Sequence, residues 1–131
     1  MSQANIDCVR RVYDALNLGG FTHAFSELSP DFELTLARGP IAGAHTGTEE
    51  LENVWNDVIA GFDYLRIEIE RILAEDDWVL AIVRREQRPQ GSTASFSSVN
   101  GHLWRFRDGV AISMVNHPDP STAFEAVGVS E

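Results

Sequence analysis

Apolar residues recur at helical spacing in two segments of the chain. The first segment forms one apolar face along a helix that "NLGG" ends at Gly19, and its members are Ile6, Val9, Val12, Tyr13 and Leu16. The second segment follows the spacing i, i+3, i+4, i+7, i+8 and i+11, and its members are Leu51, Val54, Trp55, Val58, Ile59 and Phe62. Thr46 and Glu49 fit a capping box at its start, with Thr48 as the competing N-cap. Both segments are predicted to be amphipathic helices, and Phe21, Phe25 and Leu28 predict a short helix between them.

The apolar period changes from helical to two in the second half of the chain. Leu65, Ile67 and Ile69 alternate with charged residues, which is typical of a strand with one solvated face. Three further strands are predicted at 78–88, 96–107 and 110–117, the last two joined by the Asp-Gly turn of "RDGV". An earlier strand is predicted in "FELTL", and the Gly-rich segment after it is predicted to be a loop. Asp119 and Pro120 are predicted to start a short terminal helix that Gly128 closes.

Helices followed by a meander of strands indicate an α+β fold, with the helices on one face of a curved sheet. A sheet that curls around helices of this length leaves a conical cavity at its open end, and that cavity is the expected ligand site. Because no linker divides the 131 residues, we expect a single domain over 1–131.

Composition removes several classes of function. The net charge of −10 argues against nucleic acid and against anionic membrane surfaces as partners. All ten basic residues are arginine, so lysine-dependent Schiff-base and pyridoxal-phosphate chemistry is excluded. Cys8 is the only cysteine, and the four histidines show no metal-binding spacing, so we expect neither a metal nor a cofactor. The lack of a signal sequence and of a long apolar run predicts a cytoplasmic protein.

Five motifs in order carry a resemblance to a known group: "VRRVYDALNLGGF", "PDFEL", "HTGTEELENVW", "GHLWRFRDGV" and "DPSTAFEAVG". Together they resemble the SnoaL-like branch of the nuclear transport factor 2-like superfamily over nearly the whole chain. The resemblance implies a cone-shaped barrel, in which a strongly curved, mostly antiparallel sheet wraps around the N-terminal helices. Many members dimerise through the outer sheet face. The superfamily includes polyketide cyclases, ketosteroid isomerases, limonene-epoxide hydrolases, dehydratases and non-enzymatic binding modules, so function must be argued from the site.

The final strand holds the first candidate residue. Alternation places Met114 and Asn116 on one face, together with Ile112. The resemblance implies a catalytic Asp near the end of this strand in cyclases and epoxide hydrolases, and that position falls on Asn116. An amide cannot act as a general base at neutral pH, although it can orient a water or polarise a carbonyl. The isomerase base position falls at about Leu36, which has no proton chemistry.

The second long strand offers an Arg–Glu pair. Alternation groups Arg84 and Glu86 with the apolar residues Trp78, Leu80 and Ile82 on what we predict to be the cavity face. The pair resembles the Arg-x-Asp pair of the epoxide hydrolases, which implies Glu86 as a base and Arg84 as an oxyanion-binding group. The alternative is a solvated salt bridge at a strand end. The opposite face, with Val79, Ala81 and Val83, would then be apolar and covered in a homodimer.

Other side chains have two interpretations each. His102 shares a face with Trp104 and Phe106, where it could shuttle a proton or serve as a bonded core histidine. His117 becomes a candidate base if the register of the last strand shifts by one, and is otherwise a rim residue. Tyr13 could extend its hydroxyl into the cavity or belong to the core. Trp55 fits the core stripe of its helix but could also contact a ligand.

Three functions remain open on this evidence. The first is a cofactor-independent isomerase, cyclase or hydrolase acting on an apolar, polyketide- or terpenoid-like compound. The second is a binding protein that uses the same cavity without turnover, which Asn116 in place of Asp supports. The third is a protein-interaction module that uses its outer sheet face.

Overall fold

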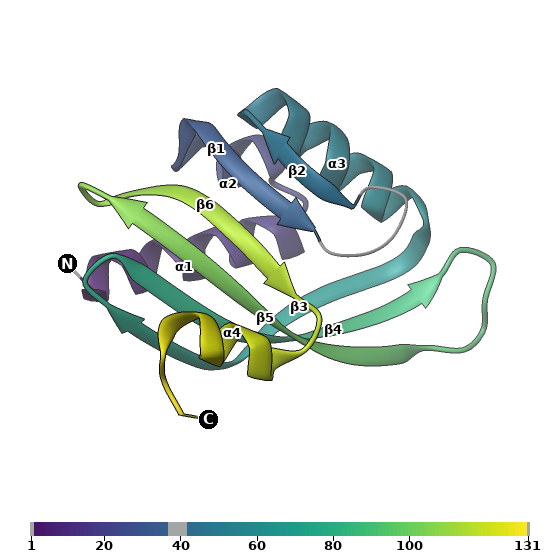
Figure 1. Cartoon of the computed structure of the whole chain (residues 1–131). Coiled ribbons are helices and arrows are strands. Elements are labelled where there is room, and N and C mark those ends of the chain that lie inside the picture. The colour runs from purple at the N-terminus through teal and green to yellow at the C-terminus, as the bar shows by residue number, and fades with distance from the viewer. Residues whose placement is uncertain (1, 37–41, 131) are drawn as a thin grey trace.

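The computed structural model describes residues 2–36 and 42–130, and it shows helices on both sides of one curved sheet (Figure 1). The helices are α1 (Ser2–Asn17), α2 (Phe21–Ser26), α3 (Thr48–Ala60) and α4 (Pro120–Val127). The strands are β1 (Leu28–Leu36), β2 (Gly43–Thr46), β3 (Phe62–Glu75), β4 (Trp78–Pro89), β5 (Phe96–Arg107) and β6 (Val110–His117). This order confirms the predicted α+β class and each of the four long strands.

The sheet has the strand order β2-β1-β6-β5-β4-β3. Strands β3 to β6 form the predicted antiparallel meander, and β1 joins it in parallel beside β6. Within the described residues the sheet is open, with β2 and β3 as its edges, so the cone is a curved sheet rather than a closed barrel. The predicted loop after β1 contains β2, which pairs with Glu33 to Leu36. The four residues of β2, Gly43 to Thr46, show no apolar alternation that would predict a strand.

The concave face of the sheet packs against α1, α2 and α3, and the main core lies there. Val9 and Val12 of α1 and Phe32 of β1 are among its most buried side chains. The convex face is covered at one end by α4, which packs Ala123 and Phe124 onto the long strands. Figure 1 shows α1 and α4 on opposite faces of the sheet. The cavity described below lies on the α1 side.

The predicted assignment of the two faces of β4 is wrong. Val79, Ala81 and Val83 belong to the main core on the concave side. Trp78, Leu80 and Ile82 lie on the convex side in the cluster that α4 covers. All six residues are buried, so alternation of apolar and polar residues gave no information on which face points inward. Val79, Ala81 and Val83 therefore form no uncovered apolar face for a dimer partner to bury, and that prediction is wrong as well.

The predicted helix ends are partly right. At α4, the Asp119 side chain accepts a hydrogen bond from the Ser121 backbone N–H, Pro120 begins the helix, and Gly128 ends it in the left-handed conformation, as predicted. The capping box predicted for α3 is wrong, because Gly47 is the N-cap and no side chain caps the helix. Thr46 is instead part of β2, where it pairs with Glu33.

Candidate functional site

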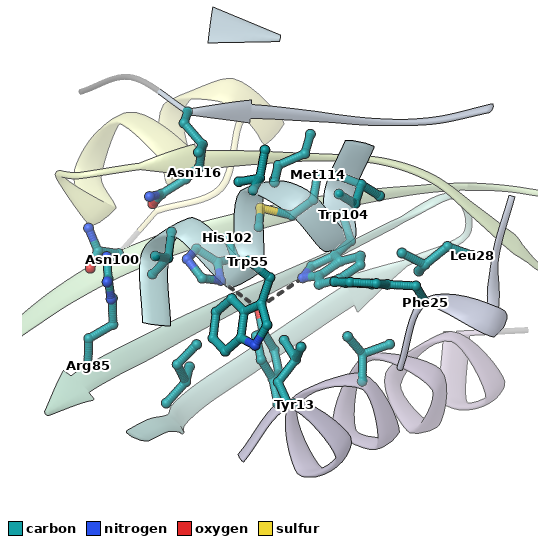
Figure 2. A pocket seen from close by; sticks show the side chains of 18 of the residues that line it. Tyr13, Phe25, Leu28, Trp55, Arg85, Asn100, His102, Trp104, Met114 and Asn116 are labelled. Carbon is teal, nitrogen blue, oxygen red and sulfur yellow. Dashed lines mark hydrogen bonds between the residues drawn. The ribbon is translucent and has the colours of Figure 1, made fainter. Parts of the chain in front are cut away.

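A cavity of about 390 Å³ lies between the concave face of the sheet and helices α1 to α3. This volume falls in the range of small-molecule sites. Most of its wall is apolar, and the described apolar or aromatic lining residues are Val12, Tyr13, Leu16, Phe25, Leu28, Phe32, Leu34, Leu36, Leu51, Val54, Trp55, Val58, Ile67, Trp104, Met114 and Pro118. The remaining described lining residues are Arg85, Ser98, Asn100, His102 and Asn116. Figure 2 shows Arg85, Asn100 and Asn116 towards one end and Phe25, Leu28 and Trp104 towards the other.

A chain of buried hydrogen bonds joins three residues of the wall. Trp104 Nε1 donates to the Tyr13 hydroxyl at 3.1 Å, and that hydroxyl lies 2.6 Å from His102 Nδ1 (Figure 2). The indole of Trp104 can only donate, so the hydroxyl keeps its own hydrogen for Nδ1. A neutral His102 that accepts at Nδ1 carries its hydrogen at Nε2. The chain therefore fixes both the tautomer and the orientation of the imidazole.

Burial keeps the members of this chain uncharged. Desolvation lowers the pKa of His102 to about 3, and the nearby positive charge of Arg85 contributes in the same direction. Desolvation also raises the pKa of Tyr13, although the hydrogen bond from Trp104 offsets part of this. At neutral pH His102 is therefore a neutral hydrogen-bond donor at Nε2. Its other nitrogen is occupied by Tyr13, which makes it a poor proton shuttle.

The polar end of the cavity is formed by β4, β5 and β6. Arg85 lies directly across from Ser98, and His102 lies directly across from Asn116. Asn116 Oδ1 is buried and has no hydrogen-bond partner among the described residues. Burial lowers the pKa of Arg85. No Asp or Glu appears among the described residues that line the cavity.

The structure brings together six of the nine predicted site residues: Tyr13, Trp55, His102, Trp104, Met114 and Asn116 all line the cavity. Their functional roles remain predictions. The other three, Arg84, Glu86 and His117, are absent from the lining.

The predicted Arg–Glu pair lies on the convex face, away from the cavity. Arg84 Nε and Nη2 donate to Glu70 Oε2 at 3.0 and 2.8 Å. Glu86 pairs across the strands with Arg66 and Ser97. The prediction that Arg84 and Glu86 face the cavity is therefore wrong. The cause is again the burial of β4 on both faces, which hides the direction of its side chains.

His117 also lies on the convex side, next to α4. Its Nδ1 lies 2.8 Å from Thr122 Oγ1, and the Thr122 hydroxyl hydrogen is used on the Asp119 carbonyl. His117 Nδ1–H therefore donates to Thr122. The register of β6 places Asn116 inward, as predicted. The one-residue shift that would make His117 a candidate base is therefore absent.

Three polar lining residues were missed from sequence: Arg85, Ser98 and Asn100. The alternation that groups His102 with Trp104 places Ser98 and Asn100 on the same face when it is followed back along β5, so that signal was present. For Arg85 there was no comparable signal, because it follows a run that is buried on both faces.

Fold and cavity together define a class: an α+β cone with a mostly apolar cavity between the sheet and the helices. The family model of the SnoaL-like domain matches residues 9–114. The chain belongs to the SnoaL-like family.

Solved structures show the same fold. A nuclear transport factor 2-like protein of unknown function from Burkholderia pseudomallei K96243 has a TM-score of 0.81 at 20% identity, covering 95% of this chain and 97% of that one. TerC co-crystallised with polyporic acid has a TM-score of 0.80 at 20% identity, covering 94% and 96%. A protein described as a candidate SnoaL-like polyketide cyclase from Jannaschia sp. CCS1 has a TM-score of 0.76 at 19% identity, covering 99% and 95%. Identities this low establish the fold alone.

No curated protein matches the chain. Within residues 2–36 and 42–130, no helix is long and apolar enough to cross a membrane. The same residues contain no group of three or more His, Cys, Asp or Glu side chains that could hold a metal ion.

Proposed function

We propose that the chain binds a small, largely apolar ring compound that carries a hydroxyl group. The observation that supports this most strongly is Asn116 Oδ1, a buried acceptor in the cavity wall without a donor among the described residues. A buried acceptor without a hydrogen bond costs about 1–3 kcal/mol, so binding of a ligand that places a hydroxyl group here would be favoured. The aromatic rings of Tyr13, Trp55 and Trp104 supply flat apolar surface for a ring.

The size and polarity of the cavity agree with this proposal. About 390 Å³ accommodates a compound of two or three rings, and most of the lining residues are apolar. TerC, which has the same fold, was co-crystallised with polyporic acid. That co-crystal supports a small molecule as the ligand proposed for this chain.

A cofactor-independent isomerase, cyclase or hydrolase is the second candidate, and the orientation of His102 favours it. A neutral imidazole fixed with its Nε2–H free can donate to a carbonyl oxygen as negative charge develops there. The described lining provides no carboxylate to take up a proton, however, and Asn116 cannot replace one. Binding without turnover therefore fits the described residues better than catalysis.

Calorimetric titration with 2-naphthol and with naphthalene tests the binding proposal. We expect 2-naphthol to bind more tightly to the wild-type protein than naphthalene does. Asn116→Leu should weaken 2-naphthol binding roughly 3- to 10-fold, which is the net value of one hydrogen bond, and should leave naphthalene binding unchanged or stronger. Failure of both compounds, and of polyporic acid, to bind would overturn the proposal.

Deuterium exchange at the carbon next to the carbonyl of 2-tetralone tests the catalytic candidate. If His102 stabilises the enolate, the wild-type protein accelerates exchange and His102→Phe does not, while Arg84→Gln on the convex face retains the acceleration. A wild-type rate equal to that of buffer alone would leave binding as the only function supported by the cavity.

A further inference from the structure

We propose that the polar end of the cavity is an anion subsite, in which Arg85, Asn100 and His102 bind the carboxylate of an aromatic acid. This inference rests on the proposed function, because the ring of the acid would occupy the apolar part of the same cavity. It specifies the ligand further, as a compound with a negatively charged group at one end. The three residues come from adjacent strands, and all three line the cavity.

Arg85 is the residue that requires such a ligand. It is half-buried, and its side chain forms neither a hydrogen bond nor an ion pair with any described residue. Its neighbour Arg84, on the other face of the same strand, is bonded to Glu70 through two nitrogens. Removing a guanidinium from water without a partner is unfavourable, and a bound carboxylate would offset that cost with two parallel hydrogen bonds.

The distribution of acidic residues strengthens this point. The chain has 20 Asp and Glu residues and a net charge of −10, yet no carboxylate is present among the described lining residues. Arg85 is therefore the only side chain carrying a full charge at neutral pH in the described wall of the cavity. A cavity with one unpaired positive charge favours an anion over a neutral compound and repels a cation.

Asn100 and His102 add hydrogen-bond donors near Arg85, while Asn116 Oδ1 at the same end is the acceptor assigned above to a ligand hydroxyl. Ser98 lies directly across from Arg85, and its hydroxyl donates to Asn100 Oδ1 at 3.4 Å. That contact uses the acceptor of the Asn100 amide and leaves its NH₂ group for another partner. His102 presents Nε2–H, because Tyr13 donates to its other nitrogen. In Figure 2 the side chains of Arg85 and Asn100 lie together at the end of the cavity opposite Phe25 and Leu28.

The electrostatic interaction between Arg85 and His102 predicts that an anionic ligand also changes the pKa of His102. The positive charge of Arg85 lowers the pKa of His102. A bound carboxylate would neutralise much of that charge, so the pKa of His102 should rise when an anionic ligand binds and should not rise with a neutral one.

The test is a calorimetric comparison of 2-naphthoate with 2-naphthamide, its neutral isostere, on wild-type protein, Arg85→Gln and Arg84→Gln. We expect wild-type protein to prefer 2-naphthoate. Arg85→Gln should weaken 2-naphthoate binding roughly 10- to 100-fold, the range for hydrogen bonds between charged groups, and change 2-naphthamide binding little. Arg84→Gln is the matched control, because it removes the same charge from the opposite face, and it should leave both affinities unchanged.

Three results separate this inference from the proposed function. If 2-naphthoate and 2-naphthamide bind equally to wild-type protein, the anion subsite is overturned and ring binding is unaffected. An equal loss of 2-naphthoate affinity in Arg84→Gln and Arg85→Gln has the same meaning. Absence of binding by 2-naphthol, 2-naphthoate and 2-naphthamide overturns both. If Arg85→Gln does not fold, the preference of the wild-type protein for 2-naphthoate over 2-naphthamide at neutral pH decides the question.

Discussion

The Tyr13 hydroxyl is shared between Trp104, which donates to it, and His102, which accepts from it. This sharing turns one side of the cavity into a rigid polar patch inside an apolar wall. It also assigns the hydrogen of His102 to Nε2, so the residue offers a donor to a ligand without needing to be charged. The chemistry of the site therefore depends on which atoms are already occupied, as much as on which residue types are present.

The buried, neutral state of His102 predicts a pH-dependent stability. In the unfolded chain its pKa returns to the ordinary value of 6.5, while in the folded protein it is lowered to about 3. Between these values the unfolded state binds more protons, so the free energy of unfolding falls as pH decreases from about 6.5 towards 3. Urea unfolding at a series of pH values should show this fall, and His102→Gln should reduce it. Parallel curves for the two proteins across this range would contradict the neutral assignment.

Individual site residues could be predicted from sequence where an apolar helix stripe or strand alternation grouped them on one face. Tyr13 and Trp55 lie on helix stripes, and alternation groups Asn116 with Met114 on β6 and His102 with Trp104 on β5. Which face of β5 points inward could not be predicted, because Asn100 to Trp104 are buried on both faces. The hydrogen bonds of these site residues could not be predicted, because Tyr13 and His102 are 89 positions apart and meet only through packing. The missing partner of Asn116 Oδ1 is likewise a property of the fold.

At the scale of elements, the position of α4 depends on one glycine. An added Cβ on Gly101 of β5 would lie 2.8 Å from Ala123 Cβ and 3.5 Å from Pro120 Cα. The helix can approach the convex face this closely only because Gly101 has no side chain.

Gly101→Ala should therefore destabilise the protein by about 1–3 kcal/mol, the usual cost of overpacking. Adding Ala123→Gly removes the opposing methyl group, so the double variant should be more stable than the sum of the two single changes predicts. Chemical denaturation of the four proteins gives the coupling directly. Additive effects would show that α4 does not depend on this contact.

The elements differed in how far sequence could define them. The stripe of α3 and the Asp-Gly turn were predicted because each has a local cause: one-sided apolar spacing in α3, and positive φ at Asp108 and Gly109 in the turn. Strand β4 was predicted in extent but reversed in face, since burial on both sides removes the alternation that reports direction. Strand β2 was missed because its four residues carry no apolar alternation, and it is recognisable only from its pairing with β1.

At the scale of the whole molecule, dimerisation through the outer sheet face remains a prediction from the family resemblance. The convex face near β3 and β4 carries the ion pairs Arg66–Glu68 and Arg84–Glu70 rather than an apolar surface. Each copy carries a net charge of −10, so two copies repel each other, and we expect a dimer formed there to strengthen as salt screens that repulsion. Sedimentation velocity at micromolar protein in low and high salt measures this, and a monomer under both conditions would rule the dimer out.

The proposed ligand, a ring compound, would enter the cavity between the sheet and the helices. The chain has three tryptophans, of which Trp55 and Trp104 line the cavity while Trp78 lies in the cluster on the convex side. The three indole N–H signals in an ¹H–¹⁵N NMR spectrum therefore report both faces at once. On titration with 2-naphthol we predict saturable shifts of the Trp55 and Trp104 signals and none of the Trp78 signal. Shifts confined to Trp78, or no shift of any indole, would contradict this proposal.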